Sequence, residues 1–187
     1  MKRLITALAL TGLLAGCSSA PALHYYSLDA DGSAQAAPVS RPQHQLVLRP
    51  VALSDELDAS KLVYQMEGKE LYFTEYQRWA GSLDGQLNQL TQNGLSARLP
   101  GWVVRQDGAR QGPVLTIWLQ RFQGRFDGRA VLSGRWRLLA EDGRVLQDTP
   151  FHLERVLPSD GYGTLVSELG LGWQQLLDQI AAELRKG

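Results

Sequence analysis

The strongest β-strand signal in this chain is LTIWLQRFQGRFDGRAVLSGRWRLLAEDGRVLQDTPFHLERV, residues 115–156 of 187. Leucine and isoleucine occupy every second position from 115 to 119, which is typical of a strand with one buried face. Asp-Gly pairs at 127–128 and 142–143 interrupt the alternation, and such pairs favour type I′ hairpin turns. The segment therefore predicts a three-stranded antiparallel meander.

Two segments outside the meander have the 3.6-residue period of amphipathic helices. The first begins near Tyr76 and is predicted to stop at Gly94, about four turns later. Its apolar positions are Trp79, Leu83, Leu87 and Leu90. The second lies beyond Gly163, and its apolar face consists of Leu165, Leu169, Trp173, Leu176, Leu177, Ile180 and Leu184.

Shorter β-prone segments complete the predicted sheet. The runs 61–66 and 70–73 flank Gly68 and are typical of a hairpin. Residues 29–45 are rich in small and polar residues and are predicted to form a loop. Further strands are expected at 25–28, 45–51 and 102–104. Together these elements predict an α+β fold, with a mostly antiparallel sheet and two amphipathic helices packed on one face.

The N-terminus has the features of a secretory signal. Lys2 and Arg3 precede an apolar run from Leu4 to Leu14, and small residues then lead to Cys17. As a helix the run would span about 16 Å against a hydrocarbon core of about 30 Å, so it is too short for a permanent membrane span. Cys17 is the only cysteine, which excludes a disulfide within the chain.

Leu14-Ala15-Gly16-Cys17 resembles the lipoprotein box of bacterial signal peptides. The resemblance implies cleavage before Cys17, a diacylglycerol on its sulfur and a third acyl chain on the new amino group. Ser18 follows, rather than the Asp that retains many such lipoproteins at the inner membrane, so the outer membrane is favoured. The alternative is an ordinary secretory signal with an incidental cysteine. The expected division is a lipoprotein signal peptide (1–16), a lipidated tether (17–24) and one domain (25–187).

The mature chain is close to electroneutral. The whole sequence holds 19 basic and 19 acidic residues, and loss of Lys2 and Arg3 leaves a small acidic excess. This balance lacks the basic footprint of nucleic-acid-binding proteins and offers no polybasic supplement to a lipid anchor. We therefore expect no nucleic-acid partner and membrane attachment through the acyl chains.

The sequence contains no convincing catalytic or metal-binding pattern. His24, His44 and His152 do not have the spacing of zinc ligands, and no Gly-x-Ser-x-Gly nucleophile motif occurs. We therefore expect no cofactor, no metal and no enzymatic activity. The alternative is a lipid-anchored periplasmic hydrolase with a carboxylate pair, drawn from acidic residues that otherwise read as solvated hairpin edges: Glu67, Glu70, Glu75 and Asp127.

An aromatic cluster is the better lead to a functional surface. Its members fall within sixteen positions and cannot all point inward if the strand and helix periods hold. We expect some of them to form a surface for a partner, a lipid or self-association. The alternative is that they cap the core where the hairpin meets the helix. The candidates are Tyr64, Tyr72, Phe73, Tyr76 and Trp79.

Short motifs spread over nearly the whole mature chain carry a family resemblance. Besides the lipoprotein box they are the segments 25–28, 62–65, 99–104, 122–128, 133–136, 150–154 and 160–162. On these motifs the chain resembles the PqiC-like family of ABC-transporter auxiliary lipoproteins, also described as membrane-integrity-associated transporter subunits.

The resemblance implies a non-enzymatic role on the periplasmic face of the outer membrane. Such lipoproteins are expected to work with an inner-membrane protein and a long MCE-domain protein that moves lipid across the periplasm. Only the lipidated Cys17 carries over as a functional residue. A ring of copies through which a partner docks is a further hypothesis, and a structural lipoprotein that binds peptidoglycan or another envelope component is the remaining alternative.

Overall fold

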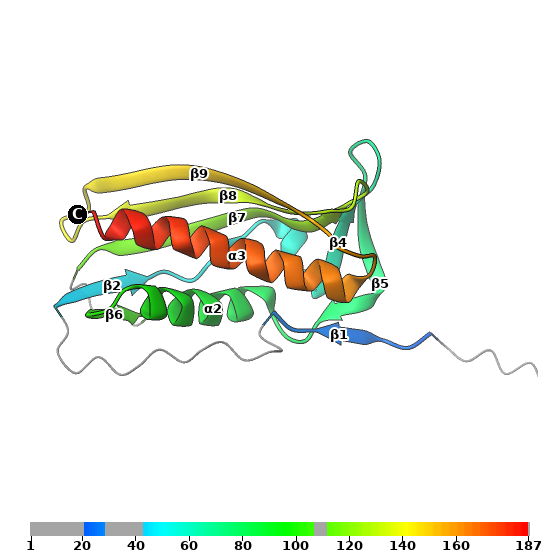
Figure 1. Cartoon of the computed structure of the whole chain (residues 1–187), viewed down its shortest axis with the longest axis horizontal. Helices are drawn as coiled ribbons and strands as arrows, with labels where there is room; N and C mark the ends of the chain where they lie inside the picture. The colour runs from blue at the N-terminus through cyan, green and yellow to red at the C-terminus, as the bar shows by residue number, and fades with distance from the viewer. Residues whose placement is uncertain (1–20, 29–42, 107–111, 187) are drawn as a thin grey trace, which may run out of the picture.

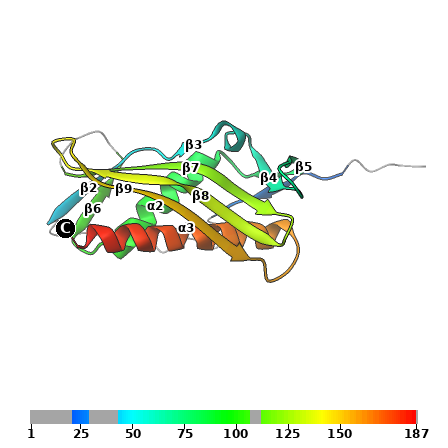
Figure 2. The same ribbon diagram turned by 90° about the horizontal axis from the view of Figure 1, so that it is seen from above.

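The computed structural model describes residues 21–28, 43–106 and 112–186. Cys17, the signal peptide, most of the predicted tether and most of the loop predicted over 29–45 lie outside these residues. In the described part, the model confirms the α+β class: two α-helices cover one face of a sheet whose two longest ladders are antiparallel (Figures 1 and 2).

The predicted meander is present as three long strands. β7 (Val114–Arg125) pairs with β8 (Arg129–Leu139), and β8 pairs with β9 (Val145–Val156), both antiparallel. The predicted type I′ turns are wrong, because only the glycine of each Asp-Gly pair has a positive φ. The β7–β8 connection is instead a three-residue loop (126–128), in which Gly128 N donates to Arg125 O at 3.0 Å. The β8–β9 connection has five residues (140–144), and Gly143 N donates to Ala140 O at 2.9 Å.

The other edge of β7 carries three short strands in succession, all parallel to it. β2 (His44–Leu48) pairs near the start of β7, β3 (Ala52–Leu53) in the middle and β4 (Lys61–Gln65) at the end. β6 (Trp102–Arg105) extends the sheet beyond β2. β7 is therefore the central strand, and the parallel pairings along its second edge were not anticipated from the sequence.

The predicted hairpin is confirmed, but its second strand is longer than expected. β5 (Leu71–Trp79) pairs antiparallel with β4 and then parallel with β1 (His24–Tyr26). Residues 76–79 therefore belong to a strand, and the prediction of a helix from Tyr76 is wrong. The sequence period misled because Trp79 is buried at the strand end and happens to lie four residues before the buried Leu83.

The first helix, α2 (Leu83–Arg98), begins after Ser82, whose hydroxyl accepts from Gly85 N at 3.3 Å. It does not stop at Gly94, as the sequence suggested. Gly94 faces the second helix, and a Cβ there would lie 2.5 Å from Leu177 Cδ1. The glycine serves a close helix approach rather than a helix end.

The second helix, α3 (Tyr162–Leu184), buries every apolar position that its sequence pattern predicted. Its Trp173 is fully buried and meets Phe122 of β7 edge to face, with ring centroids 6.3 Å apart. The indole Nε1 donates to Thr91 Oγ1 of α2 at 3.2 Å. One side chain thus joins α3, α2 and the central strand.

Two glycines of α3 provide a matched test of this packing. A Cβ at Gly172 would lie 2.6 Å from Leu132 Cδ1, whereas at Gly170 the nearest atom would be 3.9 Å away. Alanine is better than glycine in a helix by about 1 kcal/mol, but overpacking a filled core costs about 1–3 kcal/mol. We expect Gly172→Ala to destabilise the protein by about 1 kcal/mol and Gly170→Ala to stabilise it slightly.

Thermal unfolding of the purified protein, followed by circular dichroism, measures both effects. Equal stabilisation by the two substitutions would show that α3 does not pack tightly against β8.

Candidate functional site

The described chain starts close to the predicted lipid anchor. Residue 21 is four positions after Cys17, and β1 begins three residues later. β1 is held to the body by its pairing with β5 and by Ala80 N, which donates to Tyr26 O at 2.8 Å. The end of the molecule that carries β1, β4 and β5 is therefore the end at which the described chain begins (Figure 1).

The five aromatic candidates are divided between the surface and the core. Tyr72 and Phe73 of β5 are 46% and 38% exposed, and Tyr64 and Tyr76 are half-buried. Trp79 is only 3% exposed and packs against Phe122, with ring centroids 5.9 Å apart. Trp79 therefore caps the core, while the tyrosines and Phe73 remain candidates for a contact surface.

Tyr64 lines a small cavity at the same end, of about 280 Å³. Its ring lies directly against Gly124, where a Cβ would collide with it. Burial raises the pKa of Tyr64, and the charges of Asp127 and Asp160 raise it further. The phenol therefore stays neutral and able to donate. The other lining residues are Gly128, Leu157, Asp160, Gly161, Tyr162 and Leu165.

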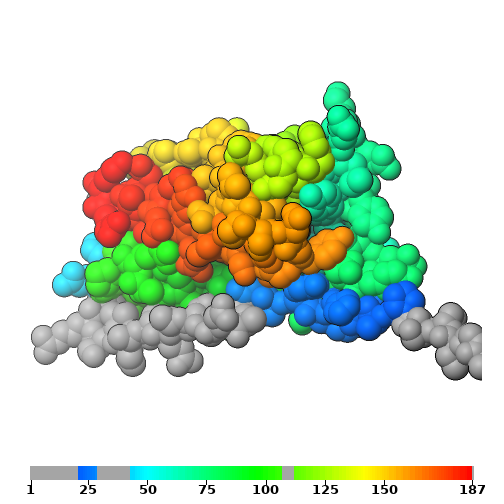
Figure 3. Space-filling view, turned by 45° about the vertical axis from the view of Figure 1, so that its right-hand side comes forward, coloured from blue at the N-terminus to red at the C-terminus, as the bar shows by residue number. Residues whose placement is uncertain are grey.

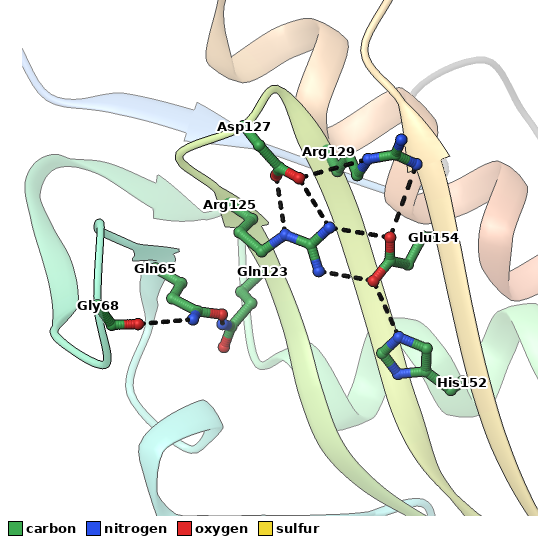
Figure 4. Close-up of polar contacts among 8 residues, drawn as sticks. All are labelled: Gln65, Gly68, Gln123, Arg125, Asp127, Arg129, His152 and Glu154. Carbon is green, nitrogen blue, oxygen red and sulfur yellow. Dashed lines mark hydrogen bonds and ion pairs between the residues drawn. The ribbon is translucent and has the colours of Figure 1, made fainter.

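A charged network occupies the sheet face opposite the helices, beside the β7–β8 turn (Figure 4). Arg125 is its centre: the guanidinium donates twice to Asp127 at 2.8 Å and to both oxygens of Glu154, at 2.6 and 2.9 Å. Arg129 lies 3.4 Å from Asp127 and 3.6 Å from Glu154, and the ring of His152 is hydrogen-bonded to Glu154 at 3.0 Å. We call these five residues the arginine network.

The electrostatics of this network argue against general acid catalysis. Hydrogen bonds from Arg125 lower the pKa of Asp127, and those from Arg125 and His152 lower the pKa of Glu154 to about 2. A hydrolase with a carboxylate pair needs one carboxyl group that holds a proton near neutral pH. Both carboxylates here are ionised, because each is bound to arginine rather than to the other.

A second ion pair lies further along the same face. Arg135 and Arg137 of β8 both donate to Asp148 of β9, at 2.6 and 2.8 Å, and these hydrogen bonds lower the pKa of Asp148. The Arg137 guanidinium also lies 5.3 Å from the centre of the Trp118 ring. The cross-strand register explains the pairing, since Asp148 is directly opposite Arg137.

Another cavity lies at the opposite end of the molecule. It is a groove of about 790 Å³ between the C-terminal end of α3, the β8–β9 turn and β6. Trp102 forms part of its wall and stacks on His44, with centroids 4.7 Å apart. Its other lining residues include Leu138, Arg144, Leu146 and Leu184.

No three His, Cys, Asp or Glu side chains of the described ranges could together hold a metal ion. Within the same residues, no helix is long and apolar enough to cross a bilayer.

Sequence reasoning missed the arginine network. Segments 122–128 and 150–154 were noted as motifs, but Asp127 was interpreted as part of a solvated hairpin edge. The available signal was the spacing itself: an acidic residue within a tight turn, with arginine two positions before and after it. The contribution of Glu154 depends on cross-strand register, which places it opposite Val131, two residues beyond Arg129 on β8.

Glu154 provides a test of the network. Because its folded pKa is depressed from 4.5 to about 2, it contributes stability that is present above pH 4.5 and is lost as the pH falls toward 2. We expect Glu154→Gln to cost about 1 kcal/mol at neutral pH, since the pair is partly solvated, and to flatten the loss of stability on acidification.

Urea unfolding at neutral and acidic pH measures this difference. Glu141→Gln is the control, since Glu141 is exposed and has no ion pair in the described residues. A Glu154 variant with wild-type stability at every pH would show that the network contributes nothing to folding.

Comparison with known proteins gives the chain a family. Residues 26–181 match the family described as the ABC-type transport auxiliary lipoprotein component. The chain is 35% identical, over 99% of its length and 98% of the relative's, to the intermembrane transport lipoprotein PqiC of Escherichia coli. The protein of the same name from Shigella flexneri matches equally well.

Solved structures agree with this result. A crystal structure of an uncharacterized protein with 32% identity superposes with a TM-score of 0.76 and covers 88% of this chain and 99% of that one. A Xanthomonas campestris protein with 16% identity shares the fold, with a TM-score of 0.69 over 84% of this chain and 92% of its own. The chain therefore belongs to the family of ABC-type transport auxiliary lipoproteins.

Proposed function

We propose that this protein is a periplasmic lipoprotein anchored in the outer membrane. It acts there as a non-enzymatic accessory subunit of an MCE-type intermembrane lipid transport system that supports envelope integrity. The observation that carries the proposal is 35% identity, over nearly the full length of both chains, to a protein named an intermembrane transport lipoprotein. Its partners are a periplasm-spanning MCE-domain protein and the inner-membrane protein of the same system.

The anchor follows from the N-terminal sequence. A single acyl chain holds a protein on a bilayer only marginally, at about 0.8 kcal/mol per buried methylene, whereas several chains together hold it firmly. A processed Cys17 with acyl groups on its sulfur and its amino group provides several chains. Ser18 in the next position supports the outer membrane as the destination.

The described domain has features that suit a docking module. Its core is filled by large apolar side chains from both helices and the sheet, which makes it a rigid body. Its paired carboxylates have lowered pKa values, which does not favour the hydrolase alternative. The groove beside Trp102 and the exposed aromatic residues of β5 provide two surfaces for binding.

Substitutions at the lipoprotein box test the anchor and its destination separately. We expect Cys17→Ala to remove the protein from the washed outer-membrane fraction, since no acyl chain can then be attached. Ser18→Asp should keep the protein membrane-bound but move it to the inner membrane, and Ser19→Ala should change neither property. Density-gradient fractionation followed by immunoblotting measures all three, and a Cys17→Ala protein that stays in the outer membrane would refute the anchoring.

Purification of the full-length protein from solubilised membranes tests the assignment to a transport system. We expect an MCE-domain protein to co-purify with the wild-type protein and to be lost with Cys17→Ala, which leaves the domain away from the membrane where the partner ends. Recovery of peptidoglycan fragments without an MCE-domain protein would instead favour the structural-lipoprotein alternative.

A further inference from the structure

Most exposed large apolar side chains of the described residues lie at one end of the molecule. Leu23 and Tyr25 come from the entry to β1 and from β1 itself, and Met66, Tyr72 and Phe73 come from the β4–β5 hairpin. Phe126 joins them from the β7–β8 turn, because its backbone N donates to Gln65 O at 2.9 Å. We call these six residues the apolar end; Figure 3 shows the side of the molecule formed by β1, β4 and β5.

So many exposed apolar side chains at one end are typical of a surface that contacts another molecule. Soluble monomers rarely expose contiguous apolar patches of more than a few hundred Å², and larger patches mark contacts with proteins or membranes. The composition of the apolar end favours a membrane surface: tyrosine has an apolar ring and a polar tip, and it is enriched where proteins meet the boundary between lipid and water. Tyr25 and Tyr72 are residues of this type, and Phe73 adds an apolar ring beside Tyr72.

The number of residues between Cys17 and β1 limits how far the apolar end can lie from the membrane. Leu23 is six residues after Cys17, and a chain extends by at most about 3.5 Å per residue, so Leu23 lies within about 21 Å of the lipidated residue. The tether (17–24) ends at the apolar end and is too short to hold Leu23 far from the bilayer. The groove lined by Leu146 and Leu184 lies at the other end, beside the C-terminus (Figures 1 and 2).

Among the described residues, the side chain of Arg78 at the apolar end has no hydrogen-bond or ion-pair partner. The side chain is partly buried, and its Nε is buried and unsatisfied. Arg78 is paired in register with both Tyr25 and Lys61, so two cations lie side by side next to an exposed tyrosine. A lipid phosphate would provide the missing acceptor. Arg78 and Tyr25 line a cavity of about 350 Å³. Asp58 lines it too and is the group that would oppose an anion there.

From these observations we propose that the apolar end lies in the headgroup layer of the membrane that holds Cys17. Its tyrosines and Phe73 enter the boundary between lipid and water, and Arg78 meets phosphate groups of phospholipids. The bilayer, and not the tether alone, then fixes the orientation of the domain, so that the groove at the opposite end faces away from the membrane. This inference rests on the proposed lipidation of Cys17.

Two single-cysteine variants of the full-length lipidated protein test the orientation. Cys17 is the only native cysteine and its sulfur carries the diacylglycerol, so Tyr72→Cys introduces one free thiol. Leu146→Cys is its control at the opposite end with similar exposure, 43% against 46%. Each thiol is labelled with bimane. The proteins are reconstituted into vesicles of phosphatidylethanolamine and phosphatidylglycerol that carry a headgroup-region nitroxide quencher.

We expect the fluorescence of the label at position 72 to fall by about twofold or more and that at position 146 to be unchanged. Equal quenching at both positions, or none at position 72, would overturn the inference. Vesicle flotation separates this failure from failure of the anchor: a protein that does not float has no lipid anchor, whereas one that floats without quenching at position 72 refutes only the orientation.

A second copy of the chain is the competing occupant of the apolar end. In that case the label at position 72 would be unquenched by the lipid nitroxide, and energy transfer between labelled copies would rise with protein density on the vesicle. That outcome would assign the surface to self-association and overturn the lipid contact.

A further substitution tests whether Arg78 contacts lipid phosphate. Arg78→Gln should weaken the quenching at position 72 in vesicles that contain phosphatidylglycerol, and Arg121→Gln on β7 is the control. If both variants behave like the wild type, Arg78 does not contact phosphate. Added inorganic phosphate should not alter the quenching, because the proposed ligand is the membrane surface. If added phosphate abolished the difference in quenching between the wild type and Arg78→Gln, Arg78 would instead belong to a site for free phosphate.

Discussion

The fold depends on one buried aromatic contact. Trp173 of α3 lies edge to face against Phe122 of the central strand, and its indole N–H is satisfied by Thr91 of α2. Thr91 in turn donates to Leu87 O within its own helix. A large ring buried without its hydrogen bond would cost free energy, so the contact sets both the distance and the rotation of the two helices over the sheet. The glycines at 94 and 172 allow the close approach that this arrangement requires.

The central strand also determines where the surfaces lie. β7 is long enough to be paired with β8 along one whole edge and with β2, β3 and β4 in turn along the other. Because these strands follow one another along β7, the β4–β5 hairpin is placed at one end of the molecule and the β2–β6 pair at the other. The aromatic residues of β5 and the wall of the groove are thereby separated by the length of the sheet. A lipoprotein that connects a membrane to a partner needs two such separate ends.

The strong periodic elements were predictable from sequence, and the long-range ones were not. The meander, the hairpin and the C-terminal helix follow from alternation, turn residues and a 3.6-residue stripe, all of which are local patterns. The start of the first helix was misplaced, because Trp79 is equally compatible with a buried strand end and a helix face. Parallel pairing along β7 left no signal, since β2, β3 and β4 are too short to show what they pair with. The spacing of Arg125, Asp127 and Arg129 in the turn indicated part of the arginine network, but Glu154 joins it only through the register of β9.

The sequence by itself determined the meander, the amphipathic stripe of α3 and the family motifs, and it predicts the lipoprotein box at Cys17, because each depends on residues that are neighbours along the chain. Only the tertiary structure decided which aromatic side chains are exposed. Trp79 and Tyr72 are both aromatic residues of one strand, yet one fills the core and the other faces solvent, because their surroundings come from distant elements. The same holds for Arg78. Its Nε lacks a hydrogen-bond partner because of how β1, β4 and the residues before α2 surround it. Exposure and charge pairing are properties of that assembly, and a linear pattern does not contain them.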